Sequence, residues 1–274
     1  MLTATMAFAL MDLMVKQLLS SMHISLVIWW RYVVQTILTV ALVIPSYRSL
    51  SLKSQKPKLQ LLRGLCLICA TISFFFGLHF MPLAETTAIS FISPILTIIL
   101  GSFVLKESTK PHHWAGSLLG FFGVLIVLRP GGQFFNAYAL FPLLAAVCFT
   151  IYQLITKALS KIDAPLTTLL YTSLVGTCIS TVPLPIFWVY PNNIQICLIL
   201  SIGFFASVAH YLLILALQNA NTSQLSPYNY PQIIWAVIFA AVFLGELPES
   251  VSLIGIGAIV AGGLIALKPR VTEE

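Results

Sequence analysis

The chain has 274 residues, of which 59% are hydrophobic and only 8% are charged, and its mean hydropathy is +0.98. Soluble domains carry about 25% charged residues, so this composition excludes a soluble enzyme or a soluble binding domain. The net charge of +6 is scattered over short loops rather than gathered in a patch, and we therefore expect no nucleic-acid partner.

A helix that crosses a bilayer needs about 20 mostly apolar residues, and the sequence predicts ten such segments. They lie at 2–21, 24–45, 61–80, 86–105, 113–129, 137–157, 165–189, 194–217, 222–244 and 251–268. The longest polar segment between them is 46–60. We expect an all-α integral membrane protein of ten transmembrane helices, embedded in the lipid bilayer.

Lysine and arginine gather on one side of this arrangement. Eleven of them follow the second, fourth, sixth and tenth segments: Arg48, Lys53, Lys56, Lys58, Arg63, Lys106, Lys110, Lys157, Lys161, Lys268 and Arg270. Positive charge next to a membrane span marks the cytoplasmic side. The pattern therefore predicts that both termini are cytoplasmic in a multi-pass protein of the bacterial inner membrane.

Two passages of the first half recur in the second half. Residues 105–130 align without a gap to 244–269, an offset of 139, and residues 8–16 match 149–157 at an offset of 141. Five segments in each half make the two copies cross the membrane in opposite directions. Inverted repeats are typical of secondary transporters with a substrate site near the midplane. The alternative is that apolar helices resemble one another through composition alone.

The turn-forming run at 130–133 separates a first repeat at 1–132 from a second at 133–274. Within the repeated passages the segments 113–129 and 251–268 are rich in glycine and alanine. Small residues at this spacing let helices approach closely. We expect them to serve the scaffold or a dimer contact, so that the protein is a monomer or a homodimer.

The first two segments contain charges that a bilayer disfavours. Asp12 and Lys16 lie one helical turn apart, and Arg31 follows Trp29 and Trp30. Either these charges snorkel or pair with Asp12, or Lys16 and Arg31 form a cationic cluster at the outer mouth that attracts carboxylates. Intramembrane charges usually mark a cavity or a partner, and we treat Trp30 and Arg31 as substrate-site candidates.

Prolines interrupt the segments 86–105 and 222–244. Pro94, Pro227 and Pro231 each lack the N–H that continues a helix, and the second interruption is surrounded by Tyr228, Asn229 and Tyr230. A broken helix is tolerated only where it lines protein or a cavity. These prolines are either simple kinks or the sign of a binding site. In the site reading, the candidates are Ser90, Phe91, Tyr228, Asn229, Tyr230 and Trp235.

Further polar residues lie in other segments. Tyr152 and Gln153 are added to the substrate-site candidates because Gln153 is the repeat counterpart of Asp12. The coupling or gating candidates are Asp12, Lys16, His79, Glu85 and His210. An intramembrane histidine is either a proton carrier or a hydrogen-bonded packing residue, and both readings stay open for His210.

Motifs of enzyme chemistry are absent from the sequence. It contains no H-E-x-x-H, G-x-S-x-G or nucleotide-binding P-loop, so we expect neither an enzyme nor a cofactor. The spacing Cys66-x-x-Cys69 lies in an apolar segment without nearby histidine or carboxylate, where cysteine behaves as a small hydrophobic residue. We expect no metal site.

Several passages resemble the drug/metabolite transporter superfamily, in its ten-span EamA-type branch: Ala9–Asp12 with Lys16, Trp30–Tyr32, the run at 82–94, Leu105–Glu107, and Ser226–Tyr230 with Trp235 and Leu244–Glu246. The resemblance implies two EamA repeats and secondary transport of small organic solutes. The Pro-Leu-Ala-Glu-Thr-Thr run at 82–87 is most similar to riboflavin and S-adenosylmethionine uptake carriers. Lys106 departs from the glycine usual in the family.

The leading hypothesis is a carrier of an aromatic, zwitterionic, nucleoside-like or amino-acid-like metabolite. Aromatic rings among scattered polar groups suit stacking with a few directed hydrogen bonds. Arg31 or Lys16 would meet a carboxylate, and Asp12 or Glu85 a cation or proton. The alternatives are an amino-acid or drug exporter of the same superfamily, and a membrane sensing or interaction subunit that does not transport.

Overall fold

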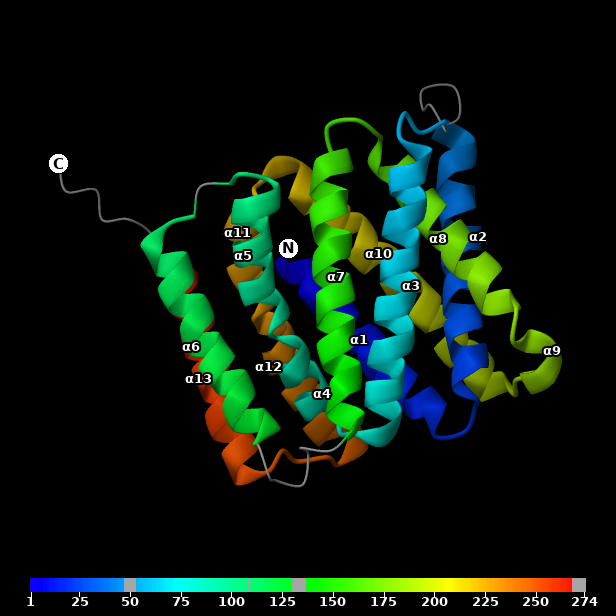
Figure 1. Ribbon diagram of the computed structural model, residues 1–274. Helices are drawn as coiled ribbons and strands as arrows, with labels where there is room; N and C mark the ends of the chain where they lie inside the picture. Colours follow the sequence, from blue (N-terminus) through cyan, green and yellow to red (C-terminus); the bar gives the residue numbers. More distant parts are fainter. Residues whose placement is uncertain (47–52, 108, 130–136, 268–274) are drawn as a thin grey trace.

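The computed structural model describes residues 1–46, 53–107, 109–129 and 137–267, and helices account for nearly all of them (Figure 1). The α-helices are α1 Leu2–Leu19, α2 Ile24–Ser46, α3 Pro57–Phe80, α4 Leu83–Ser90, α5 Ser93–Val104, α6 Pro111–Leu128, α7 Leu140–Leu159, α8 Pro165–Thr181, α9 Leu184–Phe187, α10 Asn193–Asn219, α11 Thr222–Leu225, α12 Pro231–Phe239 and α13 Ser250–Leu267. Two 3-10 turns, η1 Ala137–Ala139 and η2 Ser226–Asn229, and one π-helical turn, η3 Ala240–Leu244, complete them. The all-α class is confirmed for this part of the chain.

Eight helical segments of the described residues are long and apolar enough to cross a membrane. They are Leu2–Leu19, Ile24–Ile44, Pro57–Phe80, Leu83–Val104, Pro111–Leu128, Ala137–Leu159, Asn193–Asn219 and Thr222–Leu244. The chain is therefore a multi-pass membrane protein. The expected segment 165–189 is not one helix: α8 ends at Thr181 and the short α9 follows, because Pro183 and Pro185 cannot continue the backbone hydrogen bonding. The expected segment 251–268 corresponds to α13, whose apolar part is shorter, at Ser250–Ala266.

Both predicted helix interruptions are present. The first separates α4 from α5 at Phe91 and Ile92, and the second replaces helix by the 3-10 turn η2 between α11 and α12. Pro94 and Pro231 each lie in the first turn of the helix that follows, where the missing N–H costs nothing. Phe91 at the first interruption and Ser226 and Pro227 at the second are buried.

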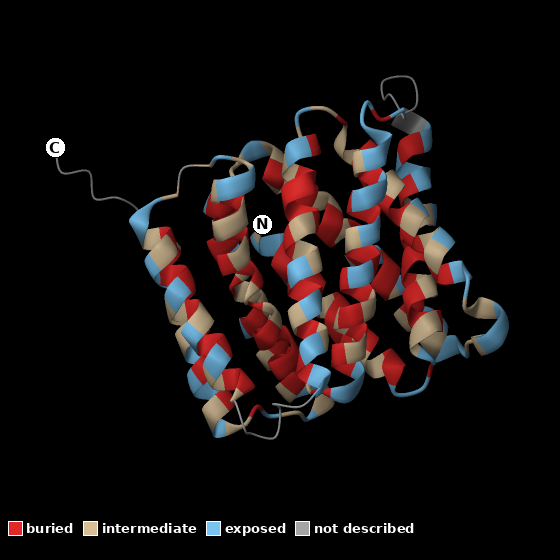
Figure 2. Cartoon of the chain, in the orientation of Figure 1, coloured by how far each residue is buried: buried red, intermediate tan, exposed pale blue. Residues whose placement is uncertain are grey.

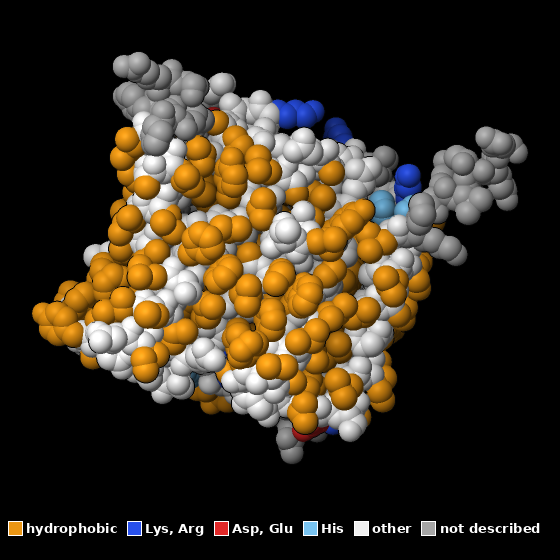
Figure 3. Space-filling model, turned by 180° about the vertical axis from the view of Figure 1, so that it is seen from behind, with side chains coloured by type: hydrophobic (Ala, Val, Ile, Leu, Met, Phe, Trp, Pro, Cys, Tyr) orange, Lys and Arg blue, Asp and Glu red, His pale blue; other side chains and the backbone are white. Residues whose placement is uncertain are grey.

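The outer surface is apolar. Buried residues line the inner sides of the helices and exposed ones face outward (Figure 2), and hydrophobic side chains cover the face seen in Figure 3 while charged ones appear at its edges. Phe103 and Val182 are each 78% exposed. Large exposed apolar side chains over the whole height of a bundle are typical of a surface that contacts lipid.

The repeated glycines join α6 to α13, which stand side by side at one end of the molecule (Figure 1). A Cβ on Gly116 would lie 2.3 Å from the carbonyl oxygen of Gly262, and one on Gly123 would lie 2.5 Å from that of Gly255. Only a hydrogen atom fits at these positions. The small residues expected to serve a scaffold or a dimer therefore pack two helices of the same chain.

Two corners of the bundle repeat each other residue by residue. Lys16 donates to the carbonyl oxygens of Leu78 and Met81, both at 2.8 Å. Its repeat counterpart Lys157 donates to those of Leu217 and Ala220, at 2.9 and 2.8 Å. Since 78 and 217, and 81 and 220, differ by 139, the two lysines hold equivalent helix ends in the two halves of the chain.

A glutamate from the opposite half completes each corner. Glu246 accepts a hydrogen bond from the backbone N–H of Leu83 at 3.0 Å, and Glu107 accepts one from that of Thr222 at 3.1 Å. The pairs 107/246 and 83/222 again differ by 139. The contacts are reciprocal: each half supplies the carboxylate that caps the broken helix of the other.

Candidate functional site

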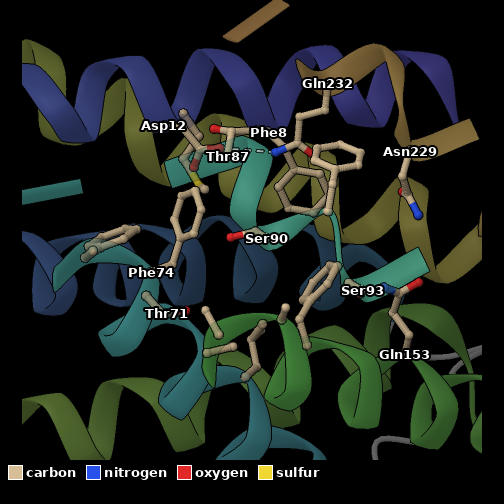
Figure 4. A pocket seen from close by; sticks show the side chains of 18 of the residues that line it. Phe8, Asp12, Thr71, Phe74, Thr87, Ser90, Ser93, Gln153, Asn229 and Gln232 are labelled. Atoms are coloured by element: carbon tan, nitrogen blue, oxygen red, sulfur yellow. Dashed lines mark hydrogen bonds between the residues drawn. The ribbon is translucent and has the colours of Figure 1, made fainter. Parts of the chain in front are cut away.

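A cavity lies between the broken helices and α1, α3, α7 and α10 (Figure 4). It offers about 130 Å³ to the centres of water molecules, roughly ten times what one water needs. Its walls combine aromatic rings with a small number of polar and charged groups. A pocket of this composition suits a small organic molecule with an apolar part and a few hydrogen-bonding groups.

Equivalent positions of the two repeats form much of the lining. Five such pairs contribute: Phe8/Phe149, Asp12/Gln153, Thr71/His210, Ser90/Asn229 and Ser93/Gln232. Phe8 and Asp12 lie four residues apart on α1, and Phe149 and Gln153 lie four residues apart on α7. This spacing places the two side chains of each helix on one face. The cavity is thus built between the two repeats, and four of the five pairs combine two different polar side chains.

The acidic group of the cavity is Asp12, which is 2% exposed. Gln232 Nε2 donates to Asp12 Oδ2 at 3.2 Å, and Figure 4 shows the two side chains approaching each other, with Phe74 and Thr71 below them. Thr71 Oγ1 lies 3.0 Å from the hydroxyl of Tyr32. These bonds connect α1 to α12 and α3 to α2 around the cavity.

The basic groups of the cavity belong to a buried chain of hydrogen bonds. Arg31 Nη2 lies 2.9 Å from His210 Nε2, and His210 Nδ1 lies 3.1 Å from the hydroxyl of Tyr152. That hydroxyl also accepts from Arg63 Nη2 at 2.8 Å. Arg63 further donates to Thr156 and to Thr172. The chain extends from the cavity wall towards the α3 end that begins at Pro57.

Seven of the predicted site residues line the cavity: Asp12, Arg31, Ser90, Phe91, Gln153, His210 and Asn229. Tyr152 lies directly behind His210 and is fully buried. Tyr230 is buried against the glycines of α6 and α13 and stacks on Phe91, with ring centroids 5.5 Å apart. It supports the wall instead of forming it.

The other aromatic candidates lie elsewhere. Trp30 contacts Trp29 and Trp188, at centroid distances of 4.6 and 6.2 Å. Trp235 stacks on Phe239 within the bundle. Tyr228 is 40% exposed and faces a second hollow next to His112 and His113. The aromatic substrate-site candidates are therefore not gathered in one site.

Three of the coupling or gating candidates lie outside the cavity lining. Lys16 is held in the corner described above, 3.7 Å from Glu246. Glu85 is 1% exposed in the first turn of α4. His79 contacts Phe80 edge to face, with centroids 4.8 Å apart. Asp12 and His210 are the coupling candidates that face the cavity.

Several lining residues were not predicted: Phe8, Thr71, Phe74, Phe75, Thr87 and Phe149. A signal existed for two of them. Phe8 and Phe149 are identical members of the repeated passage that pairs Asp12 with Gln153, and a position four residues before a cavity residue shares its helix face. The threonines and the other phenylalanines of the apolar helices carry no such mark.

Comparisons with known proteins give a consistent result. The EamA-like transporter family matches residues 1–129 and again residues 136–268. Over 256 residues the chain is 28% identical to a protein of Rickettsia bellii named S-adenosylmethionine uptake transporter, covering 93% of this chain and 88% of that protein. It is 26% identical to a riboflavin transporter of Vibrio cholerae, covering 95% and 89%. A solved crystal structure shares the fold, with a TM-score of 0.75 at 18% identity over 96% of each chain.

Proposed function

Since this chain belongs to the EamA-like transporter family and is a membrane transporter of a small metabolite, we propose that it is a secondary active carrier that works by alternating access. The observation that carries the proposal is the cavity between the two repeats, lined by equivalent residues of both. In a carrier built from inverted repeats, one half rocks against the other around such a site.

If α8 and α13 also cross the membrane, the chain has ten spans. These would form two inverted repeats, at 1–132 and 133–274. The reciprocal corners support this arrangement, because a two-fold axis in the membrane plane exchanges Glu107 with Glu246 and Lys16 with Lys157. Alternating access then requires the two corners to open in turn. The lysine-rich loops support cytoplasmic termini in the inner membrane.

The substrate class we propose is S-adenosylmethionine or a related metabolite with an aromatic part and a zwitterionic part, moved into the cell. The names of the relatives support it. The lining supports it as well, since phenylalanine rings of α1, α3 and α7 alternate with amide, hydroxyl and charged groups. The transport cycle leaves the substrate chemically unchanged and uses no cofactor.

Uptake of radiolabelled S-adenosylmethionine into proteoliposomes tests the proposal. We expect uptake well above that of protein-free liposomes, with unchanged substrate recovered from the lumen. Asp12→Ala is the site variant, and Glu249→Ala, at the exposed ion pair with Arg129, is the control. Absence of uptake of S-adenosylmethionine, riboflavin and a panel of amino acids and nucleosides would refute transport. Binding without flux would instead indicate a sensing subunit.

A further inference from the structure

The guanidinium of Arg31 is a buried cation with unused hydrogen-bond donors. The side chain is 2% exposed and lines the cavity. Its Nη2 contacts His210, while Nε and Nη1 have no hydrogen-bond partner. A buried charge without partners is costly in a membrane protein. Each edge of the guanidinium that can bind a carboxylate with two parallel hydrogen bonds includes Nη2, so the carboxylate would take Nε or Nη1 together with the second hydrogen of Nη2.

His210 adds no negative charge to this site. An arginine can only donate, so His210 Nε2 must accept from Arg31, and the hydrogen of the neutral ring must then lie on Nδ1. Nδ1 therefore donates to the hydroxyl of Tyr152, which also accepts from Arg63. Within the described residues neither Arg31 nor Arg63 forms an ion pair. Two cations are thus joined by neutral groups, and no carboxylate of the described residues lies within ion-pair distance of either.

The neighbouring charges of the bundle do not satisfy Arg31. Asp12 faces the same cavity but accepts its hydrogen bond from Gln232 and forms no ion pair with Arg31. Lys16, the other cation considered for a carboxylate, already donates to two carbonyl oxygens and lies near Glu246. The cavity consequently presents one acidic and one basic group that are not paired with each other.

We propose that Arg31 binds the carboxylate of the transported molecule, that His210 positions the guanidinium, and that Asp12 faces the cationic part of the same molecule. The ring of Phe8, which packs edge to face on His210 with centroids 5.0 Å apart, covers the apolar part between them. This assignment rests on the proposed transport function and restricts its substrate to zwitterions.

The test compares S-adenosylmethionine with its decarboxylated analogue, which lacks only the carboxylate. Removing one partner of a buried charge pair weakens binding by roughly 30-fold or more. We expect the wild type to prefer the carboxylate form by at least that factor in competition uptake assays. Arg31→Gln should lose the preference, Arg31→Lys should retain part of it, and the surface control Arg129→Gln should keep all of it.

Equal affinity of the wild type for both compounds, or an unchanged preference in Arg31→Gln, overturns the inference and leaves transport intact. If the protein takes up riboflavin, which has no carboxylate, and not S-adenosylmethionine, the inference about Arg31 is likewise overturned and transport is intact. If neither compound is taken up, the proposed substrate is wrong. The carboxylate-binding role of Arg31 is then tested by the shifts in melting temperature that methionine and methionine amide produce. Stabilisation by the acid alone, lost in Arg31→Gln, supports it, and any other result refutes it.

Discussion

Replacing Glu107 by alanine should destabilise the protein more than the same replacement of Glu246 or Glu249. Its carboxylate accepts from the N–H groups of Thr222 and Ser223 at 3.1 and 3.2 Å, and from their hydroxyls at 2.8 and 3.3 Å. A hydrogen bond to a charged group contributes about 1.5–3 kcal/mol. Because the site is half-buried and water replaces part of the loss, we expect a cost of about 2–4 kcal/mol for Glu107→Ala.

The measurement is the fraction of monodisperse detergent-solubilised protein after heating, for Glu107→Ala, Glu246→Ala and Glu249→Ala. Glu246 accepts one backbone hydrogen bond and should cost less than Glu107. Glu249 forms an exposed ion pair with Arg129, and such pairs contribute about 0–1 kcal/mol. If Glu107→Ala is no less stable than Glu249→Ala, the carboxylate does not hold α11, and the reciprocal corners are not structural links between the repeats.

Four further predictions concern the repeat corners, the glycine contacts and the buried hydrogen-bond chain. Lys106 and Gly245, equivalent in the repeats, both have positive φ, at 53° and 67°. Because a side chain is strained there while glycine costs unfolded-state entropy, Lys106→Gly should raise stability by about 0.5–1 kcal/mol, measured by thermal denaturation. Gly116→Ala should sharply reduce folded yield, since its Cβ meets the backbone of α13, whereas Gly257→Ala, with nothing within 4 Å, should not. Tyr152→Phe removes the hydroxyl bonded to Arg63 and His210 and should cost about 1–3 kcal/mol in the same assay. A cysteine placed at Ser90 can be labelled by impermeant reagents added from either side of the membrane. Glu107→Ala should favour labelling from one side and Glu246→Ala labelling from the other. Equal changes in the two variants would contradict the corner model of alternating access.

The sequence predicts much of the scaffold because bilayer physics leaves few choices. Apolar length located most of the helices, and Pro94, Pro227 and Pro231 located the breaks, since a missing N–H acts wherever the residue lies. The misjudged segment was 165–189, where Pro183 and Pro185 lie close to its end. A hydropathy pattern averages over such residues and does not show that the helix stops at Thr181.

The site was predictable where a residue type is rare in a bilayer and less so elsewhere. Asp12, Arg31 and His210 line the cavity, and each is costly in hydrocarbon. Lys16 is equally costly in hydrocarbon but caps a helix end. The cost of burying a charge therefore does not distinguish a residue that lines the cavity from one that holds the scaffold. Tryptophan and tyrosine misled for another reason, because their amphipathic rings also suit the interface and the helix packing seen for Trp30 and Tyr230.

The repeated positions at the corners and those that line the cavity differ in how similar their side chains are. The corners are chemically the same in both halves, lysine with lysine and glutamate with glutamate. The proposed alternating access requires the same contact to break and reform at each end. The cavity pairs are mostly unlike: Asp12 with Gln153, Thr71 with His210. A symmetric cavity would present identical groups to the two ends of its substrate. A molecule with one anionic and one cationic end is bound better where the halves differ, as in the roles proposed for Arg31 and Asp12.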